Sequence, residues 1–211
     1  MPKIVDHDAR RAEIARALWR VIAREGLEGA SVRVVAAEAG CSLGAVRHYF
    51  TTQDELMAVA TELMIAAVRD RVLTQLARPP GPSRAAALMA QLLPLDAQRE
   101  VEVRVWLALL GRASRDPSLA RLRLDAWHAE RYLCRVAVCD LAGTTGPSEP
   151  AQLLDPPAES LAARLHTIVD GLTLQGATVP EVVGPAELEA ALRAHLDDLA
   201  AALRAGPAAA E

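Results

Sequence analysis

Hydrophobic residues recur along most of this chain at the three- and four-residue spacing of an amphipathic helix. Between residues 8 and 24, Ile14, Leu18, Val21 and Ile22 share one side, while arginines occupy the other. The same periodicity predicts helices over about residues 53–77, 83–93, 99–114, 118–141, 158–177 and 186–204. Proline and glycine interrupt the pattern at residues 79–82, 143–157 and 179–185. No run alternates β-branched and aromatic residues, so the sequence predicts an all-α fold of about nine helices.

Residues 31–50 predict the two remaining helices, which are short and joined by a tight turn. Gly40 follows the apolar face of the first helix, where the chain must turn with a positive φ, and Ser42 can cap the second helix. Ala36, Gly40 and Val46 have the spacing of a helix-turn-helix, whose second helix lies in a DNA major groove. An ordinary helical hairpin is the alternative, because alanine is abundant in this chain.

The motif and its flanks resemble the tetracycline-repressor-like (TetR) family of bacterial regulators over about residues 8–68. The matching positions are Gly26, Ser31, Val32, Val35, Ala36, Ala39, Gly40, Ser42, Gly44, Val46, Tyr49, Phe50, Glu55 and Leu56. Residues 105–108, 116–119 and 169–177 are similar to a subgroup typified by the choline-responsive repressor of betaine synthesis genes. The resemblance implies a three-helix DNA-binding head on a helical body that senses a ligand and forms a dimer. It does not identify the ligand.

The DNA-binding candidates lie on the two short helices and at the start of the next helix. They are Ser31, Arg33, Ser42, Leu43, Gly44, Ala45, Arg47, His48, Tyr49 and Gln53. Arg47 pairs with a guanine, contacts a phosphate or is simply solvated, and the sequence leaves these roles open. The family usually has an aromatic residue at the Arg47 position and a lysine at the Gln53 position. The resemblance therefore implies an unusual base preference and some loss of affinity and salt dependence.

Charge is distributed unevenly along the chain. Residues 1–53 hold eight basic and six acidic residues, a net charge of +2, whereas the whole chain has a net charge of −4 and the remainder therefore −6. This is a weak electrostatic footprint for DNA binding. The N-terminus does not fit a signal peptide, and no stretch reaches the roughly 18 apolar residues of a membrane span. We therefore expect a cytoplasmic protein with no membrane contact, whose three cysteines are reduced.

The body offers aromatic and charged side chains that suit a small-molecule effector. The ligand-binding candidates are Arg104, Trp106, Leu110, Trp127, Arg131, His166 and Asp170. An arginine would anchor an acidic effector, whereas Asp170 with the tryptophans would suit a cation, so the charge of the ligand stays open. The alternative is that the tryptophans are core residues. We expect no cofactor, no metal and no catalytic residue, because the chain lacks a Ser-His-Asp order, a phosphate loop and metal-ligand spacing.

Two apolar stripes near the C-terminus predict a homodimer interface. They consist of Leu161, Leu165, Ile168, Val169, Leu172 and Gly176, followed by Leu188, Leu192, Leu196 and Leu199. Two such helices from each chain can form a four-helix interface, with Gly176 allowing close approach. The alternative is that both stripes face the core of their own chain. The expected domains are a head at 1–52, a sensing and dimerisation domain at 53–205 and a disordered tail at 206–211.

These patterns favour a ligand-responsive transcriptional regulator. The expected protein is a repressor that binds a pseudo-palindromic operator as a homodimer and is released by a small molecule. An enzyme built on a helical bundle and an architectural DNA-binding protein without an effector are the alternatives. The sequence does not give the effector, the operator, the target genes or the choice between repressor and activator.

Overall fold

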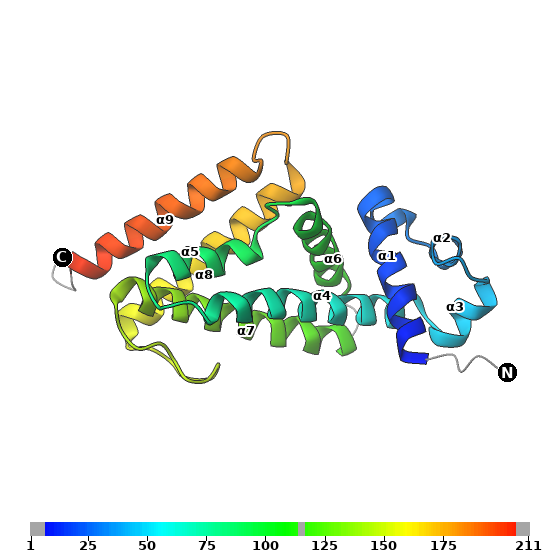
Figure 1. The fold of residues 1–211 in the computed structure, drawn as a ribbon, viewed down its shortest axis with the longest axis horizontal. Coiled ribbons are helices and arrows are strands. Elements are labelled where there is room, and N and C mark those ends of the chain that lie inside the picture. Colours follow the sequence, from blue (N-terminus) through cyan, green and yellow to red (C-terminus); the bar gives the residue numbers. More distant parts are fainter. Residues whose placement is uncertain (1–6, 114–116, 206–211) are drawn as a thin grey trace. The chain divides into compact units, whose positions relative to one another are not determined.

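The computed structural model describes residues 7–113 and 117–205, apart from the side chains of Leu27, Glu28, Gln53, Pro117 and Ser118. This part of the chain forms nine α-helices and one 3-10 turn, and contains no strand (Figure 1). The helices are α1 (His7–Gly29), α2 (Val32–Glu38), α3 (Leu43–Tyr49), α4 (Gln53–Leu76), α5 (Pro82–Met89), α6 (Ala97–Ala113), α7 (Pro117–Ala142), α8 (Pro156–Thr178) and α9 (Pro185–Ala205), with the 3-10 turn η1 at Ala90–Leu92. The all-α prediction is confirmed, and the predicted tail at 206–211 lies outside the described residues.

Packing divides the chain into two units. The first extends through Ala67 and includes Glu100–Arg121, and the second comprises Val68–Arg99 and the residues from Leu122 onward. Helix α4 contributes to both units, and most of α6 groups with the N-terminal helices. The sequence prediction placed the domain boundary at residue 52, where the helix-turn-helix head ends. This domain boundary stays a prediction.

Helix α1 supports the first unit through the stripe that its periodicity predicts. Ile14, Leu18, Val21 and Ile22 are all buried. The indole Nε1 of Trp19 donates a hydrogen bond of 2.9 Å to the Ala60 carbonyl, which fixes α1 against α4. The regular helix breaks at Gly26, whose φ of 72° lies in the left-handed region that favours glycine.

A buried ion pair fastens three helices of the second unit. Arg84 on α5 grips Asp140 on α7 with two hydrogen bonds of 2.7 and 2.6 Å. Their side chains are 13 % and 2 % exposed, so neither charge is well solvated, and each depends on the other. Arg84 also donates to the carbonyls of Leu76 and Arg78 at the end of α4. The pair therefore holds the point where α4 ends against α5 and α7.

Helices α8 and α9 close the second unit through their apolar stripes. Of the ten predicted interface residues, eight are buried in this chain: Leu165, Val169, Leu172, Gly176, Leu188, Leu192, Leu196 and Leu199. Leu161 and Ile168 are partly buried against the same core. A Cβ on Gly176 would lie 2.6 Å from Leu188 Cδ1 and 2.7 Å from Pro94 Cγ. The close approach expected at Gly176 thus occurs within the chain, and both stripes line its own core, as in the alternative reading. The single chain leaves the dimer itself untested.

Candidate functional site

The turn between α2 and α3 has the local geometry that its sequence predicts. The hydroxyls of Ser31 and Ser42 accept hydrogen bonds from the amides of Val34 and Ala45, at 3.3 and 3.1 Å, and so cap the two helices. Gly40 has a φ of 61°, the left-handed conformation that the turn requires. The Cys41 amide then closes the turn on the Ala36 carbonyl at 3.0 Å.

The helix pair is held by a small core and by one acidic clamp. Ala36 and Val46 are 4 % and 0 % exposed, which places them at the crossing of α2 and α3. Glu38 on α2 accepts hydrogen bonds from Arg20 Nε at 2.6 Å and from Arg24 Nη1 at 3.0 Å, both on α1. These bonds lower the pKa of Glu38, with the hydrogen bond from Arg20 as the largest cause. The clamp joins α2 to α1, and α3 follows on the other side of the turn.

The outer side of α3 carries the predicted contact residues. Gly44, Arg47 and His48 are exposed, and Leu43, Ala45 and Tyr49 are partly exposed. Within the described residues, neither Arg47 on α3 nor Arg33 on α2 forms an ion pair or a hydrogen bond, so both cations are available to a ligand. Each capping serine keeps its hydroxyl proton, which it can donate to a phosphate.

Near α3, one predicted contact is untested and one neighbouring residue was not predicted. The side chain of Gln53 lies outside the described residues, so its predicted phosphate contact stays a prediction. His7 was missed. Its ring lies 5.6 Å from the Tyr49 ring and 6.2 Å from the His48 ring, measured between centroids. The sequence carries no local signal for this, because His7 reaches α3 only when α1 packs on it.

Hydrogen bonds among Thr51, Thr52 and Glu55 cap the start of helix α4. Thr52 accepts a hydrogen bond from the Glu55 amide at 3.1 Å, and Glu55 accepts from the amide and hydroxyl of Thr51 at 2.7 and 2.8 Å. The bonds from Thr51, its hydroxyl first, lower the pKa of Glu55. The negative carboxylate at the helix N-terminus stabilises the start of α4.

Helix α6 ties the same unit together through two arginines. Arg104 Nη1 donates to the Ala23 carbonyl of α1 at 2.9 Å. Arg112 Nη1 pairs with Asp54 at the start of α4 at 2.6 Å. Three predicted ligand-binding residues, Arg104, Trp106 and Leu110, lie on this helix in the first unit. Arg104 already has a hydrogen-bond partner there, whereas Trp106 and Leu110 are partly buried.

The other four predicted ligand-binding residues lie together in the second unit, between α7 and α8. His166 is 2 % exposed and receives a hydrogen bond of 3.1 Å from Arg131 Nε at its Nδ1 atom. Trp127 lies 5.4 Å from the His166 ring, and the Arg131 guanidinium lies over the Trp127 ring at 5.1 Å. Asp170 Oδ2 lies 3.8 Å from His166 Nε2. The structure thus brings Trp127, Arg131, His166 and Asp170 together.

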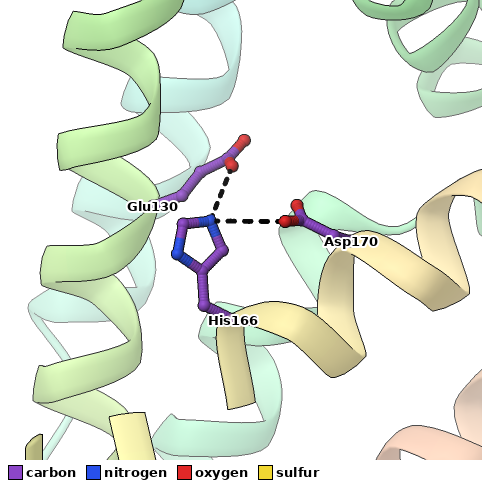
Figure 2. Close-up of side chains that lie close together, drawn as sticks. All are labelled: Glu130, His166 and Asp170. Atoms are coloured by element: carbon purple, nitrogen blue, oxygen red, sulfur yellow. Dashed lines mark hydrogen bonds and ion pairs between the residues drawn. The ribbon is translucent and has the colours of Figure 1, made fainter. Parts of the chain in front are cut away.

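Glu130 completes this cluster and was missed in the sequence. Its Oε2 atom lies 3.3 Å from His166 Nε2, on the side that also faces Asp170 (Figure 2). Glu130 reaches this ring from α7 whereas His166 lies on α8, and sequence periodicity does not pair residues 36 positions apart. We call Glu130, His166 and Asp170 with Trp127 and Arg131 the α7–α8 cluster.

The hydrogen bonds of His166 decide which chemistry the cluster supports. Because Arg131 donates to Nδ1, the ring proton lies on Nε2 and points at Glu130 and Asp170. A metal at Nε2 needs that lone pair, and its histidine ligand ordinarily donates through the other nitrogen. Although the three ligand atoms lie within 4.8 Å of one another, the Arg131 bond therefore opposes a metal site.

Comparisons with known proteins decide between an ordinary hairpin and a regulator. Residues 14–60 match the model of bacterial regulatory proteins of the tetR family. Residues 82–201 match the C-terminal model of BetI-type transcriptional repressors. This chain belongs to the TetR family.

Individual transcriptional regulators match nearly the whole chain. The HTH-type transcriptional regulator PksA of Bacillus subtilis (strain 168) is 34 % identical over 202 residues, which cover 94 % of each chain. A regulator from Rhodococcus sp. Rha1 is 37 % identical, with a TM-score of 0.76, over 91 % of this chain and 96 % of that chain. A regulator from Saccharomonospora viridis in complex with choline shares the fold, with a TM-score of 0.71 and 23 % identity over 90 % of this chain and 95 % of that chain.

Membership of the TetR family confirms the predicted class of ligand-responsive transcriptional regulators with a helix-turn-helix head. The matching models and relatives are regulators, so the enzyme and architectural alternatives gain no support from them. In the part of the chain that the structure describes, no helix combines the length and the apolar character needed to span a membrane.

The cysteines of this TetR-family regulator do not suggest thiol chemistry. Cys134 and Cys139 on α7 are buried, and burial raises the pKa of both thiols. Cys41 is partly exposed in the turn before α3. A thiol with a raised pKa is a poor nucleophile at neutral pH, because only the thiolate reacts.

Proposed function

We propose that this TetR-family regulator binds a pseudo-palindromic operator as a homodimer, with α3 of each subunit in one major groove. The observation that carries the proposal is the outer side of α3, where exposed Arg47 and His48 stand on a capped and clamped helix pair. Arg33 adds a second cation without an ion pair in the described residues, at the start of α2. Such a protein acts on the chromosome and therefore in the cytoplasm.

The contact residues divide by the chemistry they offer to DNA. Arg47 reads a guanine edge or neutralises a phosphate, and Tyr49 and His48 donate hydrogen bonds beside it. Gly44 and Ala45 let the backbone of α3 approach the duplex, and Leu43 suits a thymine methyl group. Backbone amides at the start of α2, with Ser31, suit a phosphate.

We further propose that the regulator represses and that a small effector at the α7–α8 cluster releases the operator. The cluster offers an exposed tryptophan with charged groups around a buried histidine, which suits a small ligand. Helix α4 runs through both packing units, and α6 is bonded to α1 and α4 through Arg104 and Arg112. A ligand that favours one position of these helices shifts the population of binding-competent heads.

A dimer through α8 and α9 requires a face that the chain's own core leaves free. Arg164, Thr167 and Leu174 share the exposed side of α8, and Ala190, Ala194 and Ala201 share that of α9. Leu174 is 51 % exposed, and the small side chains of α9 permit close helix packing. These faces support the proposed dimer better than the buried stripes.

The test of DNA binding is a mobility-shift titration on the regulator's own upstream region. We expect Arg47→Ala to weaken binding by roughly 5- to 150-fold, the equivalent of about 1–3 kcal/mol for one base contact. We expect Tyr49→Ala to weaken it as well, while Arg193→Ala, an exposed arginine on α9, leaves it unchanged. If Arg47 contacts phosphate instead, its loss reduces the slope of log affinity against log salt by about 0.9. Unchanged affinity in both α3 variants would contradict the proposal.

A further inference from the structure

The two carboxylates of the α7–α8 cluster converge from different helices. Glu130 comes from α7 and Asp170 from α8, and both point toward the Nε2 side of the His166 ring (Figure 2). Partial burial raises the pKa of Asp170, while His166 and Arg131 oppose the shift. The Asp170 side chain is 57 % exposed and its Oδ2 lies 3.8 Å from His166 Nε2, so a cation from solvent can reach the carboxylate and would stabilise its charged form.

The arginine of the cluster is already engaged and leaves little for an anionic ligand. Arg131 donates through Nε to His166, lies over the Trp127 ring, and has its Nη1 atom 3.7 Å from Glu159. Arg135 pairs with the same Glu159 at 2.8 Å. Apart from His166, the three carboxylates of Glu130, Glu159 and Asp170 and the two guanidinium groups give this region a net charge of −1. This balance favours a cation.

The aromatic content separates two kinds of cation. A quaternary ammonium has no N–H group and is usually recognised by several aromatic faces. Trp127 and Tyr132 are the only Trp, Tyr or Phe residues of the second unit. The Tyr132 hydroxyl donates a hydrogen bond to the Pro147 carbonyl, and its ring packs against the core. The Arg131 guanidinium already lies over the Trp127 ring. An aromatic cage is therefore missing from this unit, whereas hydrogen-bond acceptors are present.

We propose that the α7–α8 cluster binds an organic cation that donates hydrogen bonds, of the primary ammonium or guanidinium class, between Glu130 and Asp170. This inference rests on the proposed effector binding and names its chemistry. The cation replaces neither His166 nor Arg131. Its N–H groups bond the two carboxylates, and its apolar part lies toward Trp127. The Saccharomonospora viridis neighbour is in complex with choline, a quaternary cation, whereas the cation proposed for this chain carries N–H groups.

Three organic probes with similar apolar parts and one metal ion test this in calorimetric titrations of the full chain. They are hexylammonium, hexyltrimethylammonium, hexanoate and, as the metal probe, Zn²⁺. We expect hexylammonium to bind about tenfold or more tightly than hexyltrimethylammonium, because methylation removes the hydrogen bonds to the charged acceptors. Glu130→Gln and Asp170→Asn should each weaken hexylammonium binding by about tenfold. Asp197→Asn, which removes an exposed carboxylate on α9, should leave it unchanged. Far-ultraviolet circular dichroism checks that each variant is folded.

Several results would overturn the inference. They are equal or tighter binding of hexyltrimethylammonium, tightest binding of hexanoate or Zn²⁺, or an effect of Asp197→Asn equal to that of Asp170→Asn. Absence of hexylammonium binding up to about 10 mM also overturns it, since a fragment of this size in a fitting site reaches roughly 1 mM. Operator binding in a mobility shift is measured on the same samples. If operator binding is intact while a probe other than hexylammonium binds most tightly, this inference fails and the proposed function stands.

Discussion

Glu159 shows how one side chain connects a loop to two helices. It stands in the first turn of α8 and accepts two hydrogen bonds from Arg135 on α7, at 2.8 and 2.9 Å. Arg135 also donates to the Pro150 carbonyl in the segment 143–155, and the Leu154 amide donates to Glu159. The hydrogen bond from Arg135 is the largest cause of the lowered pKa of Glu159, and burial opposes it.

The lowered pKa of Glu159 makes a prediction about stability and pH. Because the folded pKa lies below the unfolded value, the contribution is present above the unfolded pKa, near 4.5, and is lost as the pH falls through the folded pKa. We expect Glu159→Gln to lower the free energy of unfolding by about 1–3 kcal/mol at pH 7 and by less at pH 4. Urea denaturation at both pH values measures this, with exposed Glu189→Gln on α9 as the control. An equal loss at both pH values would show that the ionised carboxylate is not responsible.

Single residues were predictable from the sequence where their role is local. Gly40 and Ser42 act on the two or three residues beside them, and the structure has both in the expected roles. Glu130 and His7 were not predictable, because their partners come from other helices. A residue whose function depends on a partner far along the chain gives no signal in the periodicity of its own helix.

At the level of helices, periodicity predicted where each helix lies but not what its apolar face meets. The stripes on α8 and α9 would look the same whether they faced a second subunit or their own core, since both demand buried leucines. At Gly176 the stripe faces the core of its own chain, because Leu188 and Pro94 of the same chain occupy the space beside it.

Two glycines of α8 allow a matched test of this packing. We expect Gly176→Ala to lower the free energy of unfolding by about 1–3 kcal/mol, since a methyl group must displace Leu188 or Pro94. Gly171→Ala meets no atom within 4 Å in the described chain and should stabilise the helix by up to about 1 kcal/mol. Thermal unfolding of the two variants compares them directly. Equal effects of the two substitutions would mean that the close packing at Gly176 is not a constraint.

For the whole molecule, the sequence predicted the family and the two kinds of site, but not which residues of the body lie together. The predicted ligand-binding residues fall in both packing units, and only those on α7 and α8 are seen to form a cluster. Residue order does not reveal this, since α6 groups with the head although it follows α5 in the chain.

The proposed dimer is a prediction at this scale. We expect the wild-type chain to sediment as a dimer at micromolar concentration and Leu174→Asp to shift it toward monomer, because a charge would be buried in the proposed α8–α9 interface. Leu153→Asp is the matched control, since Leu153 is 67 % exposed in the segment between α7 and α8. A monomeric wild-type chain would exclude the interface. If Leu174→Asp and Leu153→Asp sedimented alike, the dimer interface would have to lie on another surface.

Sequence-specific binding of DNA is the central claim, and one comparison tests it most directly. The affinity of the wild-type chain is measured by fluorescence anisotropy for a duplex from its own upstream region and for a scrambled duplex of equal length, at the same salt concentration. The account predicts that the upstream duplex binds at least roughly 10³-fold more tightly, as is typical of specific regulators. Equal affinity for the two duplexes, with the same salt dependence, would contradict it.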